Sequence, residues 1–307
     1  MVSMETCLRR ITRRIAFVRG GARLIEPLRR HYVKRYESSP ERFATLDDFD
    51  GDMKLRVDRA SYMGSLIYWR GYHSYRELRC LDRLLTPSMV FADVGANRGE
   101  FTIFAAKRLP HGKVLSFEPL GVCYQELLAN VRLNKLANVL PFACGLADAT
   151  KRCPLYTSTD VGAHGSWHEG LTTLYPTDDR AEFVGTAALR RFDDVFHESK
   201  LSSLHCMKID VEGAELAVLH GARDCLERFR PVLLLEINAE TFQAAGSTNR
   251  EIADLLTPLG YRLHAIGRRG SAHPAGIDKL PDFCCTLWAP TSGSSCSPAD
   301  LQRVLTA

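Results

Sequence analysis

A glycine-rich turn follows a short apolar run in the first third of the chain. The run covers residues 89–94, and the string GANRG comes directly after it. Glycine is needed where the backbone must approach a ligand without a Cβ in the way, so we expect Gly95 and Gly99 to allow that approach. Asn97 tolerates an unusual backbone angle, and Asp93 either orders the turn or holds part of the ligand. The arrangement is typical of nucleotide-type ligands in open α/β sheets, although an ordinary strand-to-helix turn can carry the same string.

A second acid, Glu118, closes the next apolar run, 19 residues after Gly99. An acid at this place can accept hydrogen bonds from both hydroxyls of a ribose. The glycine spacing G-x-x-x-G differs from the G-x-G-x-x-G that a pyrophosphate-binding turn prefers, so a single adenosine fits better than a dinucleotide. Asp148, after the third run, either bonds an adenine amino group or forms a turn.

Two further acids stand two residues apart at the end of a fourth apolar run. These are Asp210 and Glu212, and Glu236 ends the run that follows. Buried carboxylates are costly unless they are paired or used, so we expect them to face the ligand cleft. Asp210 is the leading candidate for the base or orienting group of a reacting hydroxyl, with Glu212 behind it. Three acids would also suit a divalent cation, but acids at strand ends do not by themselves indicate one, and we predict no metal.

These residues require strands that all end at one edge of a sheet. Apolar runs alternate with helical patterns from residue 89 to 289, except at 149–203. The alternation predicts a doubly wound α/β fold with a mostly parallel, seven-stranded sheet and helices on both faces. We assign residues 61–290 to this domain, 1–60 to a basic helical extension that is loop-like over 38–58, and 291–307 to a flexible tail.

The stretch 149–203 is polar and longer than an ordinary connection. We interpret it as a lid over the acceptor of the reaction. His168, beside Trp167, is a candidate general base with an aromatic platform, although a solvated loop is the simpler interpretation of both.

The first 35 residues hold ten Lys or Arg against two acids. Apolar residues recur there at helical spacing and predict one helix with a single stripe, ending near Pro27: Leu8, Ile11, Ile15, Val18, Ala22 and Ile25. Three interpretations remain, which are packing on the domain's own surface, binding to an anionic membrane, and an organelle-targeting peptide. The rest of the chain is acidic on balance and shows no basic–aromatic groove, so we expect no nucleic-acid partner.

The ten cysteines form no C-x-x-C pair and show no zinc-like spacing. Most of them stand in apolar stretches, which favours small hydrophobic residues in a reducing, cytoplasmic compartment over a disulfide framework. No apolar run reaches the roughly 18 residues that cross a bilayer, and no signal-peptide pattern stands at the start. We therefore expect a cytoplasmic protein, with peripheral membrane contact through residues 1–35 as the open alternative.

Several strings, in this order, resemble the FkbM-type methyltransferases. They are YREL at 75–78, FADVGANRG at 91–99, FEP at 117–119, KIDVEGAE at 208–215, LHGA at 219–222, RP at 230–231 and LE at 235–236. The similarity extends over about residues 72–240, and KIDVEGAE is its most specific part. One departure is RFDD at 191–194, where the family often has a TLDD-like string.

The resemblance implies a class I fold, S-adenosylmethionine as methyl donor, and O-methylation of a sugar or polyketide-like natural product. The acceptor is then a small molecule. Two alternatives stay open. One is a nicotinamide-dependent oxidoreductase on the same fold, which the glycine spacing and the fourth-strand string disfavour. The other is a non-catalytic binding module that uses the basic N-terminal segment to lie on membranes.

Overall fold

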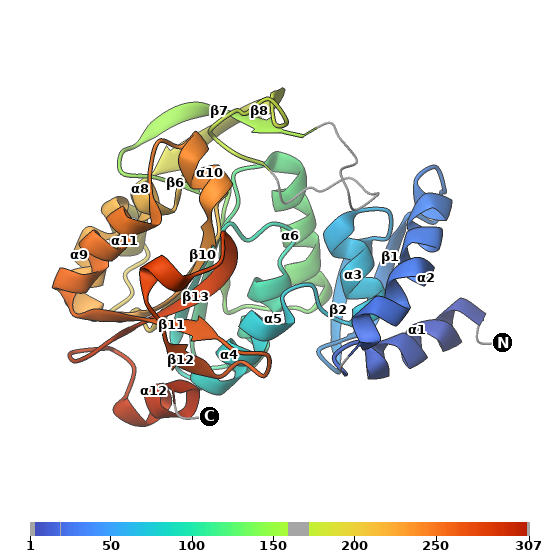
Figure 1. Cartoon of the computed structure of the whole chain (residues 1–307), viewed down its shortest axis with the longest axis horizontal. Coiled ribbons are helices and arrows are strands. Elements are labelled where there is room, and N and C mark those ends of the chain that lie inside the picture. The colour runs from blue at the N-terminus through green and yellow to red at the C-terminus, as the bar shows by residue number, and fades with distance from the viewer. Residues whose placement is uncertain (1–3, 19, 159–171, 306–307) are drawn as a thin grey trace.

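The computed structural model describes residues 4–18, 20–158 and 172–305. Its centre is an eight-stranded sheet in the order β12-β11-β13-β10-β9-β3-β4-β5 (Figure 1). The five strands from β10 to β5 pair in parallel, and β13, β11 and β12 continue the sheet in antiparallel pairs. The strands are β3 (Val90–Val94), β4 (Lys113–Phe117), β5 (Val139–Phe142), β9 (Cys206–Ile209), β10 (Val232–Asn238), β11 (Tyr261–Ile266), β12 (Ala272–Pro274) and β13 (Phe283–Pro290). This confirms the predicted fold class, with the short β12 as one strand more than predicted.

The central strands are buried on both faces. Phe91 of β3 belongs to an apolar core that includes residues of helices α4, α5 and α6, whereas the next residue, Ala92, belongs to a second core with α7, α8, α9 and α11. Strands covered on both sides consist of near-continuous apolar residues, which explains why the sequence pattern located them. The helices are α4 (Tyr75–Leu84), α5 (Glu100–Arg108), α6 (Gly121–Leu133), α7 (Phe192–Glu198), α8 (Glu215–Gly221), α9 (Arg223–Phe229), α10 (Ala239–Ala244) and α11 (Asn249–Leu256), with 3-10 turns η2 (Thr257–Leu259) and η3 (Ile277–Lys279).

The described residues between 4 and 70 form a separate layer, which we call the N-terminal layer, packed beside α5 and α6 (Figure 1). It consists of α1 (Met4–Ile15), α2 (Gly21–Tyr36), β1 (Phe43–Phe49), β2 (Met53–Asp58) and α3 (Tyr62–Arg70). The predicted single helix is wrong: the chain breaks near Gly20, whose φ is 84°. Pro27 does not end the helix, since it lies on the exposed side of α2, where water can reach the carbonyl that the proline leaves unbonded.

The segment 38–58 is a β-hairpin and not the expected loop. β1 and β2 pair antiparallel, with Leu46 opposite Leu55. The turn between them contains Asp50 and Gly51, at φ 47° and 97°. An Asp-Gly pair between runs of alternating apolar residues is a strong hairpin signal, so the information was present in the sequence. The amide of Arg56 then donates to the Asn130 side chain at 2.7 Å, which fastens the hairpin to α6.

The insertion at 149–203 contributes a small sheet. It contains β6 (Gly145–Leu146), β8 (Glu182–Arg190) and β7 (Lys151–Thr157), paired in that order. Figure 1 shows this sheet across one end of the domain.

The end of the chain is not loose as far as the structure describes it. Helix α12 (Pro298–Leu305) buries Val304 and packs on α4. Ser297 and Asp300 exchange hydrogen bonds at the start of α12, and a Ser before a Pro at the first helical position is a helix-start signal. Across the described residues, no helix combines the length and the apolar character that crossing a membrane requires.

Candidate active site

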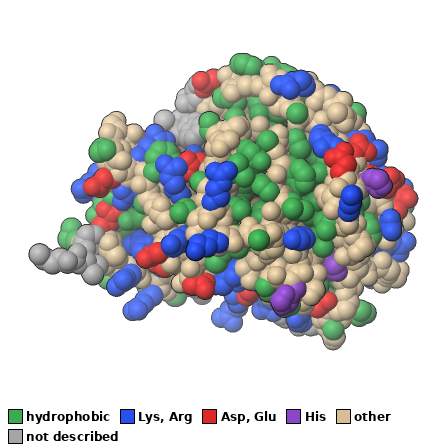
Figure 2. Space-filling model, turned by 180° about the vertical axis from the view of Figure 1, so that it is seen from behind, with side chains coloured by type: hydrophobic (Ala, Val, Ile, Leu, Met, Phe, Trp, Pro, Cys, Tyr) green, Lys and Arg blue, Asp and Glu red, His purple; other side chains and the backbone are tan. Residues whose placement is uncertain are grey.

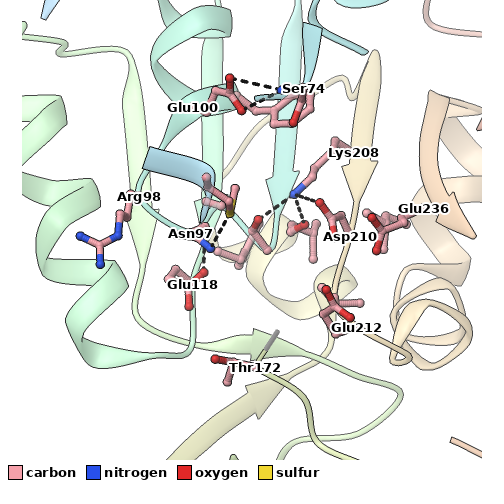
Figure 3. A pocket seen from close by; sticks show the side chains of 18 of the residues that line it. Ser74, Asn97, Arg98, Glu100, Glu118, Thr172, Lys208, Asp210, Glu212 and Glu236 are labelled. Carbon is pink, nitrogen blue, oxygen red and sulfur yellow. Dashed lines mark hydrogen bonds and ion pairs between the residues drawn. The ribbon is translucent and has the colours of Figure 1, made fainter. Parts of the chain in front are cut away.

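A cavity of about 640 Å³ opens at the edge of the sheet where the parallel strands end (Figure 3). Its walls include the glycine turn after β3, the ends of β4, β9 and β10, the small sheet of the insertion and the N-terminal layer. The predicted residues that line it are Gly95, Asn97, Glu118, Asp210, Glu212 and Glu236. Asp93, Gly99 and Asp148 do not line it, and His168 lies outside the described residues.

The two glycines of the turn are required by packing inside the protein. Gly95 and Gly99 both have left-handed backbone angles, with φ of 77° and 97°. A Cβ on Gly95 would overlap the carbonyl oxygen of Asp210, and a Cβ on Gly99 would lie only 2.8 Å from Leu127. Only glycine adopts a left-handed backbone angle without strain and has no Cβ that would clash. Packing is thus a second reason for the glycines beside the expected one, room for a ligand, which stays a prediction for Gly95 because Gly95, unlike Gly99, lines the cavity. Asn97 has the unusual angle that we expected, with φ of 49°.

Lys208 ties the glycine turn to the acids of the site. Its Nζ donates to the Gly95 carbonyl at 2.6 Å and lies 3.2 Å from Asp210 Oδ2 and 3.7 Å from Asp93 Oδ1. Burial alone would lower the pKa of Lys208, but the two carboxylates raise it above its usual value. Asp93 is fully buried behind the turn and accepts from the Thr102 hydroxyl at 2.6 Å. Its position therefore corresponds to ordering the turn, the first of its two expected roles, and contact with a ligand is not supported.

Glu118 lies at the end of β4 with its carboxylate on the cavity wall (Figure 3). One oxygen accepts the Asn97 amide at 2.8 Å and the other accepts the Leu120 amide at 2.9 Å. Burial raises the pKa of Glu118 to about 7, although these two bonds act in the opposite direction. Each carboxylate oxygen can accept a second hydrogen bond. The side chain is therefore fixed in place and still able to receive the two hydroxyls of a ribose.

Asp148 does not support the predicted contact with adenine. Its side chain is more than half exposed, lies off the cavity and pairs with Lys151 at 3.3 Å. The connection from β6 to β7 carries Asp148 at the surface. The two residues of β6, Gly145 and Leu146, line the cavity instead. The alternative expectation, a turn-forming aspartate, fits its position.

Asp210, Glu212 and Glu236 form an acid cluster on the cavity wall, with oxygens within 4.8 Å of one another (Figure 3). Two of them already face a cation of the protein: Asp210 pairs with Lys208, and Glu212 accepts from Arg180 at 2.7 Å. Burial raises the pKa of Glu212 to about 7 against the effect of Arg180. Burial also raises the pKa of Glu236 well above its usual value, and the charges of Asp210 and Glu212 add to this effect. Since protein cations compensate the cluster, it does not in itself define a metal site.

Glu215 supports the loop that carries the acid cluster. Its carboxylate accepts the amides of Val211 and Gly213, both at 3.0 Å, and the side chain is buried. Burial raises the pKa of Glu215 to about 8.

Sequence reasoning missed a further set of polar residues on the cavity wall, which are His73, Ser74 and Glu100. The backbone amide of His73 donates to Glu100 at 2.7 Å, and Nδ1 of His73 lies 3.0 Å from the Ser74 hydroxyl. Burial lowers the pKa of His73 to about 4, so the imidazole is neutral near pH 7. Burial also raises the pKa of Glu100 to about 7. All three residues line the cavity, as does Glu77.

Two parts of the chain outside the eight-stranded sheet also contribute to the cavity wall. Leu55, Tyr62 and Met63 of the N-terminal layer line the cavity. The insertion adds side chains that include Leu155 and Arg180. The proposed acceptor lid is therefore shared between the insertion and a part of the chain that the sequence analysis had treated as an extension.

The sequence was compared with known proteins. A family model described as "Methyltransferase FkbM domain" matches residues 93–263. Methyltransferase sdnD of Sordaria araneosa is 30% identical over 233 residues, which are 67% of this chain and 88% of that protein. The 31-O-demethyl-FK506 methyltransferase FkbM of Streptomyces tacrolimicus is 30% identical over 220 residues, 62% of this chain and 82% of the relative. The 2-O-methyltransferase NoeI of Sinorhizobium fredii is 25% identical over 177 residues, 55% of this chain and 72% of the relative.

Proposed function

The chain belongs to the FkbM methyltransferase family, and on that premise we propose that it methylates a hydroxyl oxygen of a sugar or of a natural-product-like small molecule. The methyl donor is S-adenosylmethionine. The observation that carries the proposal is that Glu118, with spare capacity for a ribose, shares one cavity with the acid cluster of Asp210, Glu212 and Glu236.

Glu118 is placed to hold the donor. It would accept the two ribose hydroxyls, since its carboxylate is fixed by two amides and each oxygen has a free lone pair. The turn from Gly95 to Asn97 would lie along the donor, and Lys208 keeps that turn in place. Asp93 would act from behind through Thr102 and Lys208 and not by direct contact.

When bound, S-adenosylmethionine supplies an electrophilic methyl group on a sulfonium sulfur. The protein must then position the acceptor hydroxyl and remove its proton, and we assign this role to Asp210. It would orient the acceptor hydroxyl and take its proton while the new O–CH₃ bond forms and the sulfur–methyl bond breaks. Asp210 and Glu212 each face a cation of the protein, but the Asp210 side chain is 38% exposed and the Glu212 side chain only 11%. The remaining walls would align the reactants and exclude water.

Two features support an oxygen acceptor of moderate size. The names of two relatives state O-methylation, at a 31-O position in one and a 2-O position in the other. In addition, Leu55, Tyr62 and Met63 of the N-terminal layer add apolar surface to the cavity that holds the acid cluster. An acceptor with both apolar surface and a hydroxyl would match both features.

Two measurements test the proposal in sequence. Isothermal titration with S-adenosylmethionine, with NADH as the control, should show binding of the donor alone. Transfer of a labelled methyl group is then measured to a panel of hydroxylated sugars and polyketide alcohols, each paired with its deoxy and amino analogue. We expect label only where the hydroxyl is present. Label on the amine alone would contradict O-methylation. NADH binding would favour the oxidoreductase, and a folded protein that binds no donor would favour the non-catalytic module.

A further inference from the structure

Helix α1 packs on the protein with its polar side inward. Arg9 and Thr12 are buried, at 8% and 6% exposed. Part of the apolar stripe also packs inward, since Leu8 and Ile15 lie against the core, but other apolar side chains of this segment are outside: Met4 is 75% exposed, Ile11 57% and, in the turn after the helix, Val18 62%. Cys7 is exposed as well. Positions 4, 7 and 11 recur at helical spacing and therefore share one side of α1, and the exposed Val18 follows in the next turn of the chain.

Specific hydrogen bonds hold α1 in this orientation. The Thr12 hydroxyl donates to the Trp69 carbonyl at 2.7 Å, and Arg13 donates to the Tyr68 carbonyl at 3.1 Å. Arg9 and Arg13 both pair with Asp48, at 3.1 and 2.7 Å. Rolling the helix to hide its apolar side would break these bonds and leave buried polar groups without partners, which is costly. The outward apolar row is thus a fixed feature of the surface.

Basic side chains surround the row. Arg10 and Arg14 of α1 are exposed beside it. Helix α2 lies next to α1 and exposes Leu24, at 74%, together with further cations: Arg23, Arg30, Lys34 and Arg35. The two acidic residues of this segment form other ion pairs: Glu5 pairs with Arg59, and Glu26 pairs with Arg29 and Arg30. Figure 2 shows basic and hydrophobic side chains close together at this end of the molecule.

We propose that the outer face of α1, formed by Met4, Cys7, Arg10, Ile11, Arg14 and Val18, docks on an anionic lipid surface. A helix with apolar side chains on one side and arginines beside them suits the boundary between headgroups and acyl chains. The arginine stems can lie along the apolar layer while their charged ends reach the phosphates. The positive charge of the arginines favours a negatively charged partner. A bilayer is flat on the scale of one helix, so it can contact the whole narrow row of apolar side chains. This inference concerns a surface apart from the cavity and does not depend on the proposed function.

Vesicle co-sedimentation of the full chain tests the proposal. One set of vesicles contains phosphatidylcholine alone, and the other contains phosphatidylcholine and phosphatidylglycerol in equal parts. We expect binding to the anionic set only, with an affinity that falls as salt rises because the charges are exposed. The double variant Ile11→Glu/Val18→Glu and the double variant Arg10→Glu/Arg14→Glu should each bind at least about tenfold more weakly.

The matched control is Val122→Glu on α6, a residue that is 59% exposed and lies off the cavity. It should bind vesicles as the unmodified chain does. Unchanged titration of S-adenosylmethionine by the α1 variants shows that they are folded. Equal binding to both vesicle sets, or full binding by either α1 variant, would overturn the proposal. A dimer of the unmodified chain that Ile11→Glu/Val18→Glu dissociates would also overturn it, since a second copy would then cover the face.

Discussion

The ammonium group of Lys208 lies 3.2 Å from the carboxylate of Asp210, and the same group donates to the Gly95 carbonyl at 2.6 Å. One buried side chain thus fixes the distance between the turn that would lie along the donor and the acid that would face the acceptor. Methyl transfer needs both reactants in line, so this link is where we expect the structure to be least tolerant of change.

Replacing Lys208 with Met should destabilise the protein, because it leaves Asp93 buried without its cation. Breaking a buried pair in this way costs about 3–5 kcal/mol. Urea unfolding would measure the loss. The double variant Lys208→Met/Asp93→Asn should recover part of that stability because it also removes the unpaired charge. If the double variant is no more stable than the single one, Lys208 does not act on Asp93 through charge.

Replacing Glu118 with Ala should weaken binding of S-adenosylmethionine. The loss of two charge-assisted hydrogen bonds to ribose predicts an affinity roughly 10- to 100-fold lower. Titration calorimetry measures it. Asp148→Ala is the matched control, since Asp148 lies off the cavity, and it should bind as the unmodified chain does. An unchanged affinity in Glu118→Ala would refute the ribose assignment.

Replacing Asp210 with Asn should separate binding from turnover. Asparagine keeps the size of the side chain but cannot take a proton, so with an acceptor identified from the panel we expect turnover to fall about 10²- to 10⁴-fold. The affinity for S-adenosylmethionine should change little. Near-normal turnover in a variant that still binds the donor would remove Asp210 from the role of base.

Glu215 predicts a definite effect of pH on stability. Its pKa is raised by burial to about 8 from a usual value of 4.5. Between these values the folded state holds a proton that the unfolded state has lost, so this group makes the folded state less stable as pH rises from about 4.5 to about 8. The free energy of unfolding of Glu215→Gln should lack this decline, by an amount on the order of a few kcal/mol. Urea unfolding of both proteins at pH 5 and pH 8 measures it, and parallel pH profiles would exclude the effect.

The sequence was sufficient for the parallel sheet because its strands are buried on both faces. The runs around Phe91 and Leu234 are nearly continuous in apolar residues, and chain order then places their carboxyl ends at one edge. It also located Glu118 and Asp210, since acids at the ends of such strands have few explanations other than use. The predicted adenine contact of Asp148 is not supported because the turn that carries this residue leads to the surface. No local sequence pattern indicates the direction of that turn.

Other parts of the site depend on contacts between distant residues. His73 is placed by Glu100, which stands 27 residues later, and neither residue type indicates the pairing. The sequence analysis left the inward face of α1 open, because an apolar stripe beside arginines suits packing and a membrane surface alike. The actual packing is decided by carbonyls at the end of α3 that accept from Thr12 and Arg13.

The shared wall of the cavity has a consequence for how such proteins can diversify. The family model begins at residue 93, whereas Met63 and His73, which line the cavity, precede it. The residues that would grip the donor and orient the acceptor hydroxyl therefore lie in one stretch of the gene, and a further part of the cavity wall is encoded in the stretch before it. We expect that exchanging residues 1–74 between relatives would change which acceptors fit and leave the donor chemistry intact.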